Sequence, residues 1–64
     1  MNQAAAVTTV RAIREEIVTM VGSGGREVSE VNDLITRLET GKCRPEAAIE
    51  QAMAIKSRTP AVSQ

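Results

Sequence analysis

The chain has 64 residues, carries eight acidic and eight basic side chains, and contains no Phe, Trp, Tyr or His. Without His it lacks the commonest general base and the commonest transition-metal ligand, and without aromatic rings it lacks a platform for stacking bases. We therefore expect a protein that is not an enzyme, that holds no metal or cofactor and that acts on no small-molecule substrate.

The aliphatic content is low for a chain that must fold by itself. Ile, Leu and Val together supply 14 of the 64 residues, and chains of this length have marginal cores unless something else stabilises them. The single cysteine, Cys43, excludes an internal disulfide. We therefore predict that the chain associates with itself as a homodimer or a higher oligomer.

The first predicted helix covers residues 5–21. Its apolar residues recur at steps of four and three, which places them on one helix face. They are Ala6, Val10, Ile13, Ile17 and Met20. Thr8 or Thr9 is the candidate N-cap, and the glycine-rich stretch that begins at Gly22 is expected to end the helix.

The second predicted helix covers residues 27–40. Acidic residues crowd its first half and Arg37 lies near its end, an order that the helix dipole favours. Its apolar residues are Val28, Val31, Leu34, Ile35 and Leu38. Gly41 is expected to end it in the left-handed conformation that glycine adopts at little cost.

The third predicted helix covers residues 45–57 and begins at Pro45, a residue suited to the first helical turn. Its apolar stripe is narrow and made largely of small residues: Ala48, Ile49, Ala52 and Ile55, with Met53 beside it. Residues 58–64 are predicted to form a flexible C-terminal tail.

These patterns predict an all-α protein with one helical domain over residues 1–57. Joints of about four residues suit antiparallel neighbours, so we expect a helical hairpin followed by a third short helix. The residues predicted to form the core and the contact between copies are Val10, Ile13, Ile17, Met20, Val31, Ile35, Leu38, Ile49 and Ile55.

Three local features are candidate sites of chemistry. Glu15–Glu16 and Glu46–Glu50 are carboxylate pairs, which we interpret as solvated helix surface. Cys43 lies between two cations before the third helix, where a reactive thiolate is conceivable, but a plain loop residue is the favoured interpretation. The glycine-rich stretch 22–25 lacks the Gly-Lys-Ser/Thr sequence of a phosphate-binding loop, so we interpret it as a hinge.

Residues 14–35, REEIVTMVGSGGREVSEVNDLI, resemble the helix-turn-helix of bacterial transcription regulators such as the cyclic-AMP receptor family. The resemblance places Ile17 and Val21 before a turn at Gly22, and it implies a recognition helix that packs inward through Val28 and Val31. The chain departs from the pattern at residue 18, where a Val replaces the usual small residue.

Charge weighs against DNA as the partner. Residues 1–35 hold three basic and five acidic side chains, whereas residues 36–64 hold five basic and three acidic ones, so the segment that resembles a DNA reader lies in the acidic half. A dimeric DNA-binding regulator is therefore the alternative prediction. Its contact residues would be Arg26, Arg37, Lys42 and Arg44.

The favoured prediction is a small non-enzymatic protein–protein interaction module, an adaptor, inhibitor or accessory subunit of the kind common among bacterial and phage proteins. Its expected partners are a second copy of itself and an unidentified protein, with nucleic acid as the alternative. The sequence has no basic leader and no long apolar run, from which we expect a cytoplasmic protein that does not contact a membrane.

Overall fold

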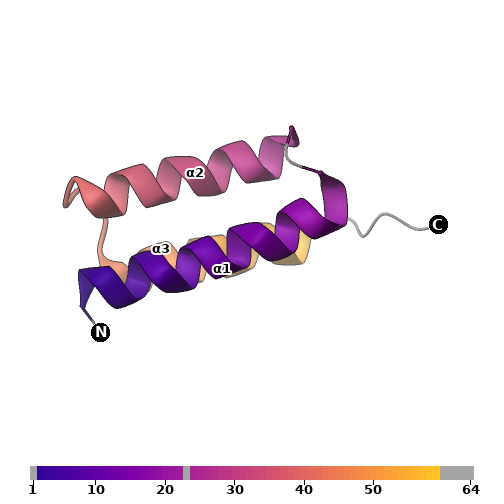
Figure 1. The fold of residues 1–64 in the computed structure, drawn as a ribbon. Helices are drawn as coiled ribbons and strands as arrows, with labels where there is room; N and C mark the ends of the chain where they lie inside the picture. The colour runs from indigo at the N-terminus through magenta and orange to yellow at the C-terminus, as the bar shows by residue number, and fades with distance from the viewer. Residues whose placement is uncertain (1, 23, 60–64) are drawn as a thin grey trace.

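The computed structural model describes residues 2–22 and 24–59 and contains three α-helices in that part of the chain: α1 (Gln3–Val21), α2 (Arg26–Glu39) and α3 (Pro45–Arg58) (Figure 1). No strand occurs among the described residues. The prediction of an all-α protein is thus confirmed, and each predicted helix end lies within two residues of the observed one.

The start of α1 differs from the prediction. The N-cap is Asn2, whose side-chain Oδ1 accepts a hydrogen bond of 2.8 Å from the backbone N–H of Ala5. Thr8 and Thr9, the predicted caps, lie inside the helix instead, and their hydroxyls donate to the carbonyls of Ala4 and Ala5. The N-cap, Asn2, thus lies about one helical turn before Ala6, where the periodic apolar pattern begins.

The end of α2 matches the prediction. Gly41 has a φ of 75°, and its N–H donates to the carbonyl of Leu38 at 3.1 Å. The next N–H, that of Lys42, reaches back to the carbonyl of Arg37 at 2.8 Å. These two bonds form a Schellman motif, which satisfies carbonyl groups that the helix leaves without partners.

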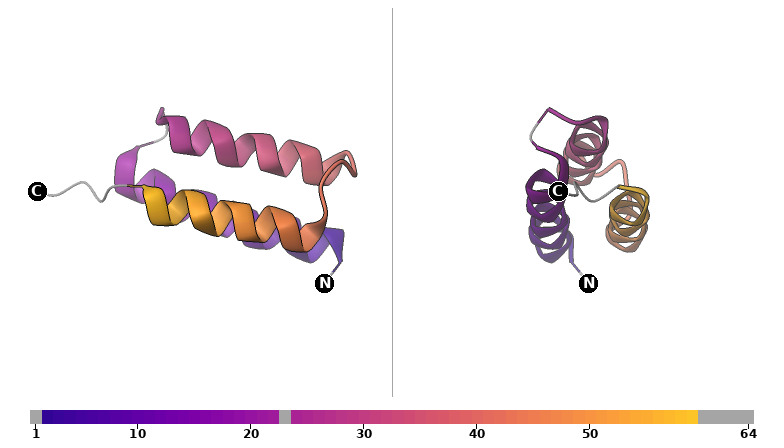
Figure 2. Two further views of the ribbon diagram at one scale, coloured as in Figure 1. Left: turned by 180° about the vertical axis from the view of Figure 1, so that it is seen from behind. Right: turned by 90° about the vertical axis from the view of Figure 1, so that its right-hand side faces the viewer.

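The three helices form an up-down-up bundle. Helix α2 runs antiparallel to α1 and α3, which lie beside each other and point the same way (Figure 2). Every pair of helices is in contact. The structure therefore contains the expected antiparallel hairpin, α1–α2, and α3 packs against both of its helices.

The core lies along the axis of the bundle and draws on all three helices. Its buried residues are Ala6, Val10, Ile13, Ile17, Val28, Val31, Leu34, Ile35, Leu38, Ala48, Ala52 and Ile55. Two residues of the predicted core are only half-buried: Ile49 packs against the edge of the core, and Met20 lies at the border between α1 and α3.

The C-terminal end of the domain was placed too early by the sequence. Arg58 is the last residue of α3, and it binds Glu30 of α2 through a 2.9 Å ion pair. Thr59 is buried, and its hydroxyl donates to the carbonyl of Ile55 at 2.8 Å. These two residues belong to the bundle, and the rest of the predicted tail, 60–64, lies outside the described residues.

Candidate interaction surface

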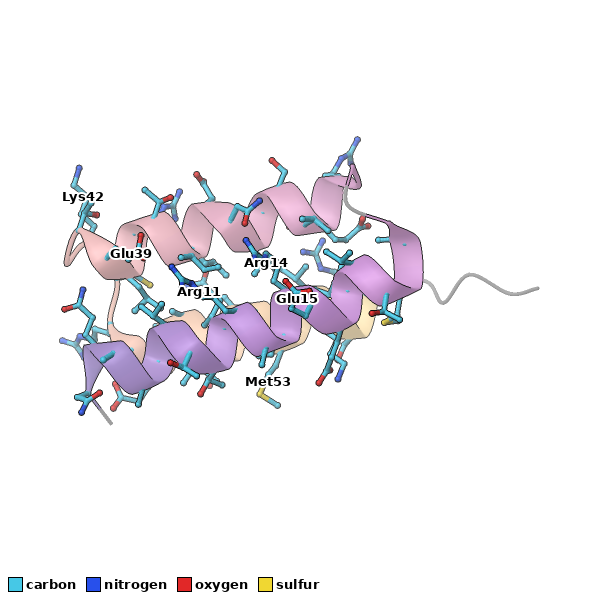
Figure 3. All side chains as sticks on the ribbon, viewed as in Figure 1. Arg11, Arg14, Glu15, Glu39, Lys42 and Met53 are labelled. Carbon is cyan, nitrogen blue, oxygen red and sulfur yellow. The ribbon has the colours of Figure 1, made fainter. Side chains whose placement is uncertain are left out.

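Polar side chains bridge each of the three outer grooves between helices. Between α1 and α2, Arg11 forms a 3.1 Å ion pair with Glu39 (Figure 3). In the same groove, Arg14 donates a 2.9 Å hydrogen bond to the side-chain oxygen of Asn32. Between α2 and α3, the Arg58–Glu30 pair makes a similar bridge. Long charged side chains of this kind also cover apolar surface with their methylene stems.

The groove between α1 and α3 differs from the other two because an open hollow lies along it. The ion pair that crosses this groove joins the Lys56 ammonium to the Glu16 carboxylate. Beside this pair lies an open hollow of about 480 Å³. Its lining residues are Thr9, Ile13, Glu16 and Met20 of α1 and Met53, Lys56 and Ser57 of α3.

A second open hollow, of about 470 Å³, adjoins the first along α3 and shares Met53 with it. Its other lining residues are Glu46, Ile49 and Glu50. We call the combined surface, made of the lining residues of both hollows, the Met53 groove. It faces away from α2, and the Met53 side chain extends from the bundle on that side (Figure 3).

Met53 stands out among the described residues because it is the only large hydrophobic side chain classed as exposed, with 56% of its surface accessible. Ile49 and Met20, on either side of it, are half-buried. A single exposed apolar side chain is common on protein surfaces, but Met53 also lines both hollows, which makes this groove the candidate site.

The sequence predicted only part of what these lining residues do. Ile49 and Met20 were predicted as core residues, and Met53 was noted only as a flank of the third helix. The available signal was the spacing of Ile49 and Met53: residues four apart share a helix face, and this face is not the one that carries Ala48, Ala52 and Ile55. What the sequence could not reveal is that neither α1 nor α2 covers it.

The cations proposed for DNA binding do not share one surface. Arg26 begins α2, whereas Arg37 lies in its last turn, about 16 Å further along the axis. Lys42 and Arg44 lie in the connection beyond that turn. Arg26 is therefore separated from the other three by most of the length of the bundle.

The helices of residues 14–35, the segment that resembles a helix-turn-helix, are not arranged as they are in that motif. A DNA-reading pair crosses at about 90–120°, but α1 and α2 lie side by side and antiparallel (Figures 1 and 2). This hairpin geometry gives the resemblance no support.

The other predicted sites are dispersed. Glu15 pairs with Arg14 at 3.2 Å, and Glu16 binds Lys56, so these adjacent carboxylates contact different cations. Cys43 is half-buried in the wall of a third hollow, formed by the α2–α3 connection and the start of α1. In the part of the chain that the structure describes, no three His, Cys, Asp or Glu side chains are grouped so as to hold a metal ion.

Comparison with models of protein families, with curated proteins and with solved structures finds no match to the chain. Within residues 2–22 and 24–59, none of the helices offers a stretch both long and apolar enough to cross a membrane. The Met53 groove is therefore the feature of the molecule that bears on its function.

Proposed function

We propose that this protein is a non-enzymatic protein–protein interaction module, an adaptor, inhibitor or accessory subunit, and that the Met53 groove is its binding surface. The observation that carries the proposal is the exposure of Met53 at the centre of an apolar hollow that no helix of the bundle covers. Methionine suits such a surface because its flexible, polarisable side chain adapts to the shape of a partner.

The shape of the groove favours a helix as the bound element. Its two walls are α1 and α3, which run side by side in the same direction. A helix of the partner, laid in this groove, would pack on α1 and α3 as α2 does on the opposite side of the same pair. Helix-in-groove binding is a recurring mode of recognition, with apolar anchors spaced three or four residues apart.

Site-specific photo-crosslinking in the native cell tests the proposal. A photoreactive amino acid replaces Met53 in one variant and Ser29, an exposed residue of α2, in the other. We expect a discrete crosslinked product of higher mass from position 53 and none from position 29. The mass of the product distinguishes a second copy of the chain from another protein.

The proposal is rejected if position 53 yields no product, or if both positions yield the same set of products. Circular dichroism at 222 nm, measured on both purified variants, confirms that the substitutions leave the helices intact.

A further inference from the structure

We infer that Met53 is a site of reversible oxidation, at which a peroxide converts the thioether to a sulfoxide and so makes the Met53 groove polar. The effect on binding rests on the proposed function, and it is a way in which that binding is regulated. Three observations support the inference: the sulfur content of the chain, the exposure of Met53 and its position in the groove.

Few side chains of this protein react readily with a peroxide. The chain has no Trp, Tyr or His, and its sulfur-containing side chains are three methionines and one cysteine. Met1 lies outside the described residues, and Met20 is half-buried, whereas Met53 is 56% exposed. Cys43 is half-buried too and lies in a different hollow, so its oxidation does not alter the groove. Because oxidation requires access to the sulfur, Met53 is the described methionine that a peroxide reaches most easily.

The reaction transfers one oxygen atom to the methionine. The lone pair of Sδ attacks one oxygen of hydrogen peroxide, the O–O bond breaks as the S–O bond forms, and water leaves with both protons. The sulfur loses the two electrons that the peroxide gains. The sulfoxide is polar, and two reductases, one for each of its epimers, restore the thioether. Met53 can therefore pass between an apolar and a polar form.

The position of Met53 determines what this change does. Met53 lines both hollows of the groove, and its side chain extends from the bundle on the side away from α2 (Figure 3). The described core, and the hydrophobic residues packed against it, do not include Met53. Oxidation therefore changes the centre of the binding surface and leaves the packing of the helices intact. A sulfoxide buried against apolar side chains of a partner loses its hydration without gaining a hydrogen bond, which weakens binding.

Peptide mass mapping tests which methionine reacts. The folded protein is treated with hydrogen peroxide for increasing times and digested with trypsin, which places Met20 and Met53 in different peptides; fragmentation distinguishes Met53 from Cys43, which shares its peptide. We expect Met53 to react at least roughly threefold faster than Met20. In concentrated urea, where the chain is unfolded, the two rates should converge, because the fold alone creates the difference in access.

Photo-crosslinking tests the effect on binding. A photoreactive amino acid replaces Glu50, which lines the groove beside Met53, and the purified protein is added to an extract of the native cell before or after peroxide treatment. We expect oxidation to lower the yield of crosslinked product at least roughly threefold, and the two sulfoxide reductases to restore it. The matched variant Met53→Leu keeps an apolar side chain of similar size, so oxidation should leave its yield within about 1.5-fold.

The inference is overturned if Met20 reacts as fast as Met53 in the folded protein, if the crosslinked product survives oxidation of Met53, or if the Met53→Leu variant loses its product equally. A loss of ellipticity at 222 nm on oxidation would also overturn it, because the effect would then come from unfolding. If no product forms even before oxidation, the proposed function fails, whereas the comparison of Met53 with Met20 still decides whether Met53 is the oxidation site.

Discussion

At the scale of single residues, Gly41 is a position where the backbone restricts the side chain. Its φ of 75° is strained for residues with a Cβ, although the space around it is open. We expect Gly41→Ala to lower the free energy of unfolding by about 1 kcal/mol. The measurement is urea denaturation followed by circular dichroism at 222 nm, since the chain has no aromatic side chain to serve as a fluorescent reporter.

Gly24 provides the matched control. A Cβ there also meets open space, but its φ is not positive, so Gly24→Ala introduces no such strain. We expect a change near zero or a slight stabilisation, because alanine restricts the unfolded chain more than glycine does. Equal losses in the two variants would show that the conformation at Gly41 is not what ends α2.

The start of α1 and the end of α2 show which capping residues can be identified from a sequence. The role of Gly41 was predictable because a glycine after the last periodic apolar residue has a specific conformational meaning. The role of Asn2 was missed because the periodic pattern begins at Ala6. The first turn of α1 contains Gln3 and small alanines, and these residues give no apolar signal.

At the scale of helices, the end of α3 gives a test of where the bundle stops. Thr59 is buried directly after the last residue of α3, and the carbonyl of Ile55 accepts hydrogen bonds from both its hydroxyl and its N–H. We expect Thr59→Asp to lower the free energy of unfolding by more than about 2 kcal/mol, because it buries an unpaired charge. The measurement is again urea denaturation.

Thr59→Val is the companion variant. It preserves the shape of the side chain and removes the hydroxyl, while the N–H of residue 59 still satisfies the carbonyl of Ile55. Replacing a buried polar group by an apolar one of the same shape is close to neutral, so we expect a change within about 0.5 kcal/mol. If Thr59→Asp were equally neutral, residue 59 would belong to a solvated tail, as the sequence had suggested.

The buried face of each helix could be predicted from the sequence, but the position of the neighbouring helices around that face could not. Period and spacing identified the buried stripe of each helix, including Val10, Ile17 and Leu38, because burial on one face imposes a helical repeat. The same repeat does not say which flank of a stripe a neighbouring helix covers. Ile49 and Met20 lie on flanks beside the outer groove between α1 and α3, and for this reason they are half-buried rather than buried.

At the scale of the whole molecule, buried alanines enlarge a core for which the sequence supplies few Ile, Leu and Val residues. Ala6, Ala48 and Ala52 are fully buried, and they join the larger aliphatic residues where the helices meet. The accessible surface of 4120 Å² is close to the roughly 3950 Å² that size scaling gives for a folded monomer of 6.8 kDa. A single chain thus forms a continuous core, and self-association stays a prediction for experiment.

The oligomeric state is a property of the whole molecule that sedimentation equilibrium measures directly. If copies associate through the Met53 groove, a charge at its exposed apolar side chain opposes their contact, so Met53→Asp should lower the mass observed at high concentration to that of one chain. Ser29→Asp, on the exposed face of α2, is the control and should leave the mass unchanged. An equal mass for both variants and the parent chain would place any contact between copies away from this groove.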